Sequence, residues 1–423
     1  MVLALLLSLS LAAAPVAHKP GKSEKLLAGK VCGADNKACT ILAHDAGADA
    51  LGQSLSVVEV RGQPPPPDTQ CERVRWVLVT SKDKKIAATR DLLDLCNDGY
   101  GASGVGEDTV QVGPNQLSFR EAGGSSWRWT LGKIWQLSPL QLKSESDDGF
   151  WSVAANTEHR EWSWTDFSGS VSWFAPLCNA EGSPQESDKT TNWDSTLVPD
   201  VEALPKDFAA TLWKTTHLGG CAALIDGSAG HGFTTFGRKG GEKDSAMRVV
   251  RSGDTLFVEI SDDRWTGAGV NWLNDDHLEV WLGKLSGGWQ DPCLEPNKLK
   301  DARQWAVRLA DGAVFPAYGN PIEALGVELD SSAPEGTAKT YRLKLTLPRG
   351  FDLFTVVYSD SDEGKRQERL IATSRLEFGV VPSFGQARKL KAAEASCVVR
   401  EGKLEPVPSS NVAKEGPLHS SGQ

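Results

Sequence analysis

The chain has 423 residues, of which 40% are hydrophobic and 24% are charged. This balance is typical of a folded protein, and the length predicts more than one domain. The formal net charge of −10 argues against nucleic acid or an anionic membrane as the main partner, because both repel an acidic protein. The 42 Gly and 22 Pro are spread along the chain, which favours many short strands joined by turns.

Residues 1–17, MVLALLLSLSLAAAPVA, are predicted to form a secretory signal peptide that is cleaved after Ala17. The apolar run Val2–Ala14 is too short to span a bilayer. We therefore expect an exported protein, whether secreted, periplasmic or at the cell surface, that is at most peripheral to a membrane. A misplaced start codon and a buried N-terminal segment are the alternative interpretations.

The chain carries eight cysteines, an even number that favours disulfide bonds in an exported protein. A zinc site is the alternative, but no CxxC pair is present, and Cys32 and Cys39 are further apart than in a zinc knuckle. Half of the cysteines precede residue 100, so we expect that region to be cross-linked. The eight are Cys32, Cys39, Cys71, Cys96, Cys178, Cys221, Cys293 and Cys397.

Residues 31–178 are predicted to form a β-rich, disulfide-linked domain, whose function the sequence leaves open. Strands are expected at Val74–Thr80 and Ile86–Thr89, and Thr109–Arg120 is expected to form a hairpin that turns at Gly113-Pro114-Asn115. Tryptophans are frequent later in this domain, and two pairs of them are spaced to share a strand face. They serve either as core or as an aromatic platform for a glycan or another partner: Trp127 with Trp129, and Trp162 with Trp164.

Residues 179–197 are polar and poor in aliphatic side chains, which predicts a linker between domains. The second domain is expected to span residues 198–384. Residues 385–423 lack periodicity and are predicted to form a flexible tail that Cys397 could tether. The expected fold class is therefore mainly all-β, with two β-rich domains of which the second is a β-sandwich.

The segment Leu256–Leu282, LFVEISDDRWTGAGVNWLNDDHLEVWL, is the most informative part of the chain. Its two ends alternate between apolar and polar residues, which is the pattern of half-buried strands. Leu256, Val258 and Ile260 share one face of the first strand. On the second strand, Leu278, Val280 and Leu282 share one face, and His277, Glu279 and Trp281 share the other.

The loop between these strands combines hard oxygen ligands with flat aromatic surface. Carboxylate and amide oxygens suit calcium, which takes six to eight oxygen ligands, whereas a Trp ring can stack on a sugar. We predict calcium ligands among Asp262, Asp263, Asp275, Asp276 and Glu279. The candidate ligand-binding residues are Trp265, Asn271, Trp272 and Asn274. The alternative is that the Asp and Asn residues form turns and that the Trp residues belong to the core.

The order of these motifs resembles the carbohydrate-binding module of family 9. In that family a strand of the form v.v.v.Dd precedes a strand of the form D.vEl.ld, and a D.D..g.R hairpin lies near the end. The matching residues here are Val258, Ile260, Asp262 and Asp263, then Asp276, Leu278, Glu279, Val280 and Leu282, and finally residues 356–366, VVYSDSDEGKR.

The resemblance covers roughly residues 198–384. It implies a β-sandwich, calcium in some members and a sugar held between two Trp, for which Trp265 and Trp272 are the candidates. The resemblance supports the fold more strongly than the function, because domains of one shape bind different ligands. We therefore expect a polysaccharide or glycan as the partner.

Asp360-Ser361-Asp362-Glu363-Gly364 begins like a calcium loop, but Ile371 stands where an EF-hand needs a bidentate Glu, which excludes an EF-hand. A hairpin turn is the favoured interpretation, and a metal site is the alternative.

No recognised catalytic motif is present, so we predict no catalytic residue and favour a non-catalytic protein. Two alternatives to polysaccharide binding remain open. The first is an envelope-associated structural or protein-interaction protein. The second is a glycoside hydrolase, for which Asp263 and Glu279 form the first carboxylate pair to test.

Overall fold

The computed structural model contains β-strands and three short 3-10 helices among the residues that it describes. No described helix is long and apolar enough to cross a membrane. The all-β fold class predicted from the sequence is confirmed. The described residues are 39–45, 54–63, 72–82, 85–97, 107–113, 116–124, 127–137, 140–151, 156–176, 190–237, 244–267, 272–284, 302–319, 323–331, 339–351, 353–376, 384–392 and 394–408.

The chain divides into two compact units. The first comprises residues 1–121, 134–141 and 413–423, and the second comprises residues 122–133 and 142–412. The predicted signal peptide lies outside the described residues.

The first unit contains an antiparallel sheet in the order β1-β2-β3-β4. Alternating valines such as Val58 and Val77 give this sheet a small buried core. The predicted hairpin is confirmed, since β5 ends at Gly113 and pairs with β6, which begins at Gln116. The strand bounds are β1 Cys39–Asp45, β2 Ser54–Gln63, β3 Glu72–Lys82, β4 Lys85–Asn97, β5 Glu107–Gly113, β6 Gln116–Gly124 and, shared with the second unit, β7 Trp127–Leu137.

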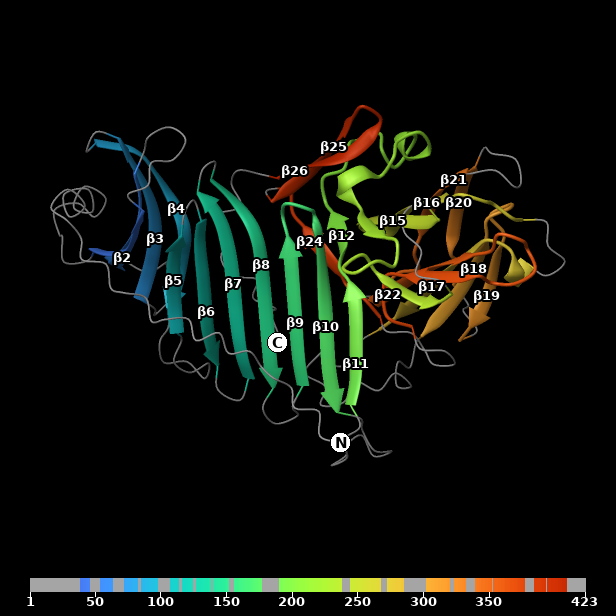
Figure 1. The fold of residues 1–423 in the computed structure, drawn as a ribbon, viewed down its shortest axis with the longest axis horizontal. Coiled ribbons are helices and arrows are strands. Elements are labelled where there is room, and N and C mark those ends of the chain that lie inside the picture. The colour runs from blue at the N-terminus through green and yellow to red at the C-terminus, as the bar shows by residue number, and fades with distance from the viewer. Residues whose placement is uncertain are drawn as a thin grey trace. The chain divides into compact units, whose positions relative to one another are not determined.

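The second unit begins with an antiparallel ladder of four strands, β8 to β11, which run side by side in Figure 1. They are β8 Leu140–Trp151, β9 Asn156–Ser163, β10 Ser168–Pro176 and β11 Thr190–Thr196. Trp162 and Trp164 are buried and pack against Phe167, and Trp173 packs against Trp193. These tryptophans are therefore core residues, which was the first of the two interpretations of the Trp-rich segment.

The remainder of the second unit is a sandwich of two sheets. One sheet has the order β20-β21-β16-β15-β12-β24, with β13 also paired to β15. Its strands are β12 Val198–Val201, β13 Ala223–Ile225, β15 Ser245–Ser252, β16 Thr255–Asp262, β20 Gly326–Ser331, β21 Lys339–Thr346 and β24 Ala387–Leu390.

The other sheet of the sandwich has the order β14-β23-β22-β17-β18-β19. Its strands are β14 Phe233–Phe236, β17 His277–Gly283, β18 Arg303–Arg308, β19 Val314–Tyr318, β22 Leu353–Asp360 and β23 Arg369–Ala372. The three short helices are η2 Leu212–Lys214, η3 Gly219–Cys221 and η4 Trp272–Asn274.

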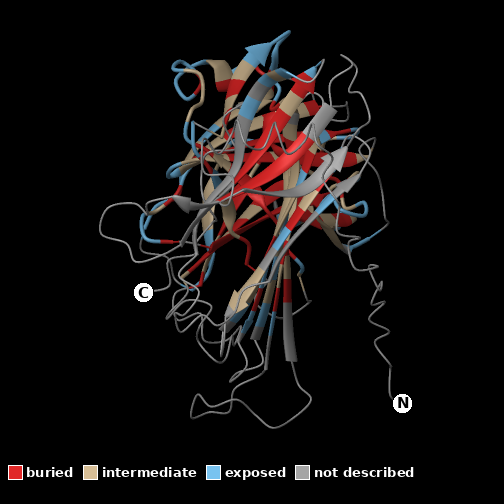
Figure 2. Cartoon of the chain, turned by 90° about the vertical axis from the view of Figure 1, so that its left-hand side faces the viewer, coloured by how far each residue is buried: buried red, intermediate tan, exposed pale blue. Residues whose placement is uncertain are grey.

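Alternating apolar residues from both sheets fill the interior of the sandwich. Buried residues concentrate in its strands, shown in red in Figure 2. The alternation predicted from the sequence is confirmed, because all the expected inward residues belong to one buried cluster: Leu256, Val258, Ile260, Leu278, Val280 and Leu282. The apolar residues of β21 belong to the same cluster: Tyr341, Leu343 and Leu345, with Leu347 directly after the strand. Their burial fixes the register of each strand, since a slip of one residue would expose the whole row.

The C-terminal hairpin of β25 Ala395–Arg400 and β26 Lys403–Pro408 is attached to the sandwich by a disulfide between Cys221 and Cys397. The disulfide expectation is thus met at this pair, and Cys397 tethers the C-terminal region. The prediction of a flexible tail from residue 385 is wrong, because three strands form between residues 387 and 408. Leu390 and Leu404 are buried there, and β24 pairs in parallel with β12.

Part of the expected linker is also structured. Residues 190–196 form β11, in which Trp193 is buried against Phe384. Residues 373–375 lie alongside β11. The backbone amide of Thr196 donates to the carbonyl oxygen of Thr373, and the amide of Arg375 donates to that of Asp194. A polar composition therefore did not prevent this segment from forming a strand, because one buried Trp and the backbone hydrogen bonds hold it in place.

Candidate functional site

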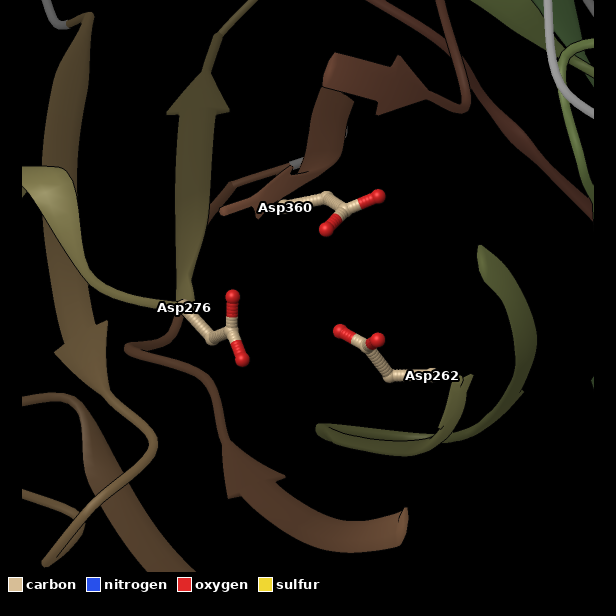
Figure 3. Close-up of side chains that lie close together, drawn as sticks. All are labelled: Asp262, Asp276 and Asp360. Atoms are coloured by element: carbon tan, nitrogen blue, oxygen red, sulfur yellow. The ribbon is translucent and has the colours of Figure 1, made fainter. Parts of the chain in front are cut away.

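Three aspartates lie at one end of the apolar interior of the sandwich. Asp262 lies two positions after Ile260 on β16, Asp360 two positions after Tyr358 on β22, and Asp276 two positions before Leu278 of β17. Because side chains alternate along a strand, each aspartate points to the same side as its apolar neighbour. The three carboxylates consequently face one another between the sheets, as Figure 3 shows. We call Asp262, Asp276 and Asp360 the acidic cluster.

The acidic cluster is compact and almost fully buried. One oxygen from each carboxylate lies within 4.8 Å of one oxygen from each of the other two. Asp262 is 4% exposed, Asp276 is 0% exposed and Asp360 is 5% exposed. Charged carboxylates at this spacing repel one another strongly in a protein interior, unless protons or a cation offset their charge.

Hydrogen bonds to both oxygens fix two of the three carboxylates. Asp276 accepts the backbone amides of Thr266 and Ser361, each at 2.9 Å. Asp262 accepts the backbone amide of Arg264 at 2.8 Å and the hydroxyl of Tyr358. These bonds orient the carboxylates and tie the loops after β16 and β22 to the end of the sandwich.

Asp360 differs from its two neighbours because one of its oxygens is not used. Its Oδ2 accepts the hydroxyl of Ser245 at 2.8 Å, whereas its Oδ1 has no hydrogen-bond partner among the described residues. The hydroxyl of Tyr341, which is 0% exposed, also has no partner in the described part of the chain. A buried polar atom without a partner costs about 1–3 kcal/mol, so both atoms indicate a place for a ligand.

Burial raises the pKa values of all three carboxyls, and repulsion by neighbouring carboxylates adds to it. Burial, followed by the charge of Asp262, raises the pKa of Asp276 to about 9. The same two causes raise the pKa of Asp360 to about 7. Burial raises the pKa of Asp262 to about 6, against the hydrogen bond from Tyr358. The protein environment therefore disfavours three negative charges at this place.

A lysine and two aromatic rings form one wall beside the acidic cluster. Lys339 is 7% exposed, and its Nζ lies 4.0 Å from the ring centroid of Trp265 and 4.7 Å from that of Tyr341. Trp265 is half-buried and packs against the core. Burial lowers the pKa of Lys339, and the charge of Asp276 opposes that effect.

A second group of carboxylates adjoins the acidic cluster. Asp262 also belongs to a group with Asp263 and Asp362, whose oxygens lie within 4.8 Å of one another. Asp263 is exposed and Asp362 is half-buried. Carboxylate oxygens thus continue from the interior of the sandwich to its surface through the shared Asp262.

The opposite face of β17 carries a different set of side chains, which point away from the core. Trp281 pairs across the sheet with Gln304 of β18, and Gln304 pairs with Tyr318 of β19. The rings of Trp281 and Tyr318 reach over Gln304, with their centroids 5.6 Å apart and their planes at 39°. Tyr318 is 48% exposed. We call Glu279, Trp281, Gln304 and Tyr318 the outer aromatic face.

Glu279 is held rigidly on the outer aromatic face. Its Oε2 accepts the indole N–H of Trp281 at 3.2 Å and the amide of Gln304 at 2.8 Å. The His277 Nε2 lies 3.6 Å from its Oε1. Burial pushes the pKa of Glu279 up, but His277, Trp281 and Gln304 outweigh it and hold the pKa below its ordinary value. The carboxylate is therefore ionised and fixed in orientation.

The five predicted calcium ligands separate into four places. Asp262 and Asp276 meet in the acidic cluster, and Asp263 lies in the adjoining exposed group. Asp275 is buried, but neither carboxylate group of the described residues includes it. Glu279 lies on the outer aromatic face, because it alternates with the inward Leu278 and Val280. This separation also places Asp263 and Glu279, the pair considered for glycoside hydrolysis, on different faces of the strand–loop–strand unit.

The predicted sugar-binding residues are placed less completely. Trp265 lies beneath the ammonium of Lys339, and Asn274 is half-buried at the end of η4. Asn271 lies outside the described residues, and only the backbone of Trp272 is described.

Sequence reasoning does not place Tyr318 in a site, and it gives Asp360 a metal role only as the alternative to a hairpin turn. That turn is present between β22 and β23. A usable signal existed, since all three motif segments place an Asp two positions from a core residue. Tyr318 gave no such signal, because its contact with Trp281 depends on the pairing of β18 with β19.

The sequence matches no family model and no curated protein. Two solved structures are similar to part of the chain, and both are family 9 carbohydrate-binding modules from Caldicellulosiruptor kristjanssonii. The complex with cellotriose has a TM-score of 0.30 and 10% identity, and covers 46% of this chain and 93% of the module. The complex with glucose has a TM-score of 0.25 and 14% identity, and covers 38% of this chain and 85% of the module.

Proposed function

We propose that the protein is an exported, non-catalytic binding protein for polysaccharide, which it holds on the outer aromatic face. The observation that carries this proposal is the Trp281–Tyr318 ring pair beside the fixed, ionised carboxylate of Glu279. Aromatic rings offer flat apolar area to the C–H face of a sugar. A carboxylate and an amide at the edge of the rings can accept and donate hydrogen bonds to sugar hydroxyls.

The geometry favours neutral polysaccharides over acidic ones. Glu279 is ionised, and the formal charge of the whole chain is −10. Both features repel uronic acids and sulfated sugars. The site also lies on three paired strands, β17, β18 and β19, and a rigid site loses little conformational freedom when a ligand binds.

Binding to insoluble cellulose, xylan and chitin would test this proposal. We expect the full chain to sediment with at least one of them, and we expect Trp281→Ala or Tyr318→Ala to weaken that binding about tenfold or more, as for an aromatic ring at the centre of a contact. Phe236→Ala is the matched control, because Phe236 is 49% exposed on β14, at the other edge of the same sheet. Binding that survives both aromatic substitutions unchanged would contradict the proposed site.

We further propose that the acidic cluster holds one calcium ion that stabilises the fold. Its donors fit calcium, since all of them are oxygens and the Oδ1 of Asp360 is unused. The unpartnered hydroxyl of Tyr341 is close enough for the charges of Asp276 and Asp262 to raise its pKa. Asp262, Asp276 and Asp360 would hold the ion, which would supply the positive charge that three buried carboxylates need. No step of sugar binding is assigned to it.

Thermal unfolding in calcium and in EDTA would test this second proposal. Calcium binds only the folded protein, so we expect it to raise the Tm of the native chain. Asp360→Asn should abolish most of that rise, because it removes one of the three charged ligands. Asp311→Asn is the control, since Asp311 is an exposed partner of Arg308. An equal calcium response in wild type and Asp360→Asn would sink the proposal.

A further inference from the structure

Lys339 stands where an ion-pair partner of Asp262 is expected. The two residues are directly opposite each other on the paired strands β21 and β16. Lys339 lies two positions before the core residue Tyr341, as Asp262 lies two positions after the core residue Ile260. Their side chains therefore leave the sheet on the same, inward side, where opposite charges on facing residues normally pair.

The ammonium of Lys339 does not pair with the acidic cluster, however. Its interactions with described residues are with the rings of Trp265 and Tyr341, at 4.0 and 4.7 Å. It forms no ion pair within 4.0 Å among those residues, although the charge of Asp276 acts on it. The lysine thus contributes positive charge from the wall while leaving the carboxylate oxygens accessible to another cation.

The charges at this place have a simple balance. When a cation is bound, the three buried carboxylates are ionised, and with one ammonium they leave a residual charge of about −2, which one divalent cation neutralises. The charges of Asp263 and Asp362 are screened by water, because Asp263 is exposed and Asp362 is half-buried. Burial of a net charge is costly, so the most stable occupant is the one that brings the sum closest to zero. Without the ammonium, the carboxylates would leave a charge of about −3 and would favour a trivalent ion more strongly.

We propose that Lys339 is the internal counter-cation of the acidic cluster and sets its residual charge to that of one divalent ion. This inference rests on the proposed calcium site, and it adds the residue that sets the charge preference of that site. Lys339 belongs to β21, in the other sheet from the outer aromatic face, so its effect should be on cation affinity and selectivity. The ring of Trp265 beside the ammonium also provides an optical signal, because Trp can sensitise the luminescence of terbium.

The test compares calcium and terbium binding to the full-length wild type and Lys339→Met. Met keeps the length and the apolar stem of the lysine but removes its charge. Loss of a unit charge several ångströms away should tighten calcium binding about tenfold or more. Repulsion scales with the charge of the ion, so the logarithm of the terbium change should be about 1.5 times that of calcium, or roughly 30-fold for a tenfold calcium effect.

Two variants serve as controls. Lys344→Met removes the same charge from the same strand, but Lys344 pairs with Glu328 on the outward side, so both affinities should stay within about twofold of wild type. Lys339→Arg keeps the charge and should retain the preference of wild type for calcium over terbium more closely than Lys339→Met. Lys339→Gln provides a second neutral variant if Lys339→Met does not fold in calcium.

The possible results separate the two proposals. If Lys339→Met tightens terbium binding more than calcium binding, the counter-cation role is supported. If wild type and Lys339→Met bind both ions equally well, the calcium site stands and the role of Lys339 is refuted. If terbium and calcium affinities change by the same factor, the effect is steric and the charge argument fails. If neither protein binds either ion, both the calcium site and this inference are overturned.

Discussion

Asp147 and Asp148 are adjacent on β8 and have opposite electrostatic surroundings, because successive side chains point to opposite faces of a sheet. Burial raises the pKa of Asp147 to about 6, against the charge of Arg160. Asp148 is exposed and bonds to His159 at 2.5 Å. The hydrogen bond that His159 donates to Asp148 raises the pKa of His159. The folded protein therefore disfavours the charged form of Asp147, whereas Asp148 stabilises the charged form of His159.

Asp147→Asn should stabilise the protein at pH 8 but not at pH 4.5. The ordinary pKa of 3.8 rises to about 6 on folding, so the folded state takes up a proton. The stability linked to that proton is present below pH 4 and is lost as the pH rises through 6. Asn mimics the protonated form, so the gain at pH 8 should be about 1–2 kcal/mol after allowance for solvent screening. Urea unfolding at the two pH values measures it.

Asp148→Asn is the control for this prediction, because it should destabilise the protein, whereas Asp147→Asn should stabilise it. It removes the acceptor that stabilises the His159 imidazolium, so it should lower stability most at pH 5, where the imidazole is charged in the folded state. An equal effect of Asp147→Asn at pH 4.5 and pH 8 would contradict the assigned cause.

Residue-level alternation was predictable from the sequence, whereas encounters between distant strands were not. The rows Leu256–Val258–Ile260 and Leu278–Val280–Leu282 face the core as expected, because period-two burial is a local property. Asp262 and Asp276 were correctly placed near one another at the ends of those strands. Asp360 joins them only because β22 pairs with β17, and no spacing along the chain records that pairing.

At the scale of elements, Arg369 connects three segments that the sequence treats separately. It is 2% exposed on β23. Its Nη1 donates to the backbone oxygen of Ser245 at 3.0 Å and to the hydroxyl of Ser245 at 2.9 Å, and its Nη2 donates to the backbone oxygen of Asp226. The same Ser245 hydroxyl donates to Asp360, so Arg369 also supports the acidic cluster from outside.

Arg369→Leu should lower the free energy of unfolding by about 3 kcal/mol or more, because it removes the donor of several buried hydrogen bonds and leaves the acceptors without partners. Arg366→Leu is the control in the same hairpin, since the side chain of Arg366 is 81% exposed and its ion pair with Glu368 is worth little. Urea unfolding followed by Trp fluorescence compares the two. Equal losses would show that the connection made by Arg369 is unimportant.

At the scale of the whole molecule, composition was a poor guide to where structure ends. Residues 190–196 and 387–408 are polar or irregular in pattern, yet they form strands. They are held by a few buried residues, such as Trp193, Leu390 and Leu404, and by backbone pairing. β11 pairs with the preceding strand β10, whereas β24 pairs with β12, which is far away in the sequence. The average composition of a segment does not reveal single buried residues of this kind. The strand with which a segment pairs also cannot be read from the segment's own sequence.

The disulfide between Cys221 and Cys397 is another long-range connection, because its two ends are 176 positions apart in the sequence. A cross-link over so long a loop strongly restricts the unfolded chain, so replacing both cysteines by serine should cost about 3–5 kcal/mol of unfolding free energy. The β25–β26 hairpin should be the first part to open, because this bond joins it to η3. Hydrogen exchange of Val398 and Val399, compared with that of Val258 in the core, would show the order. If β25 stays as protected as β16 in the double variant, backbone pairing and the burial of Leu404 hold the hairpin without the disulfide.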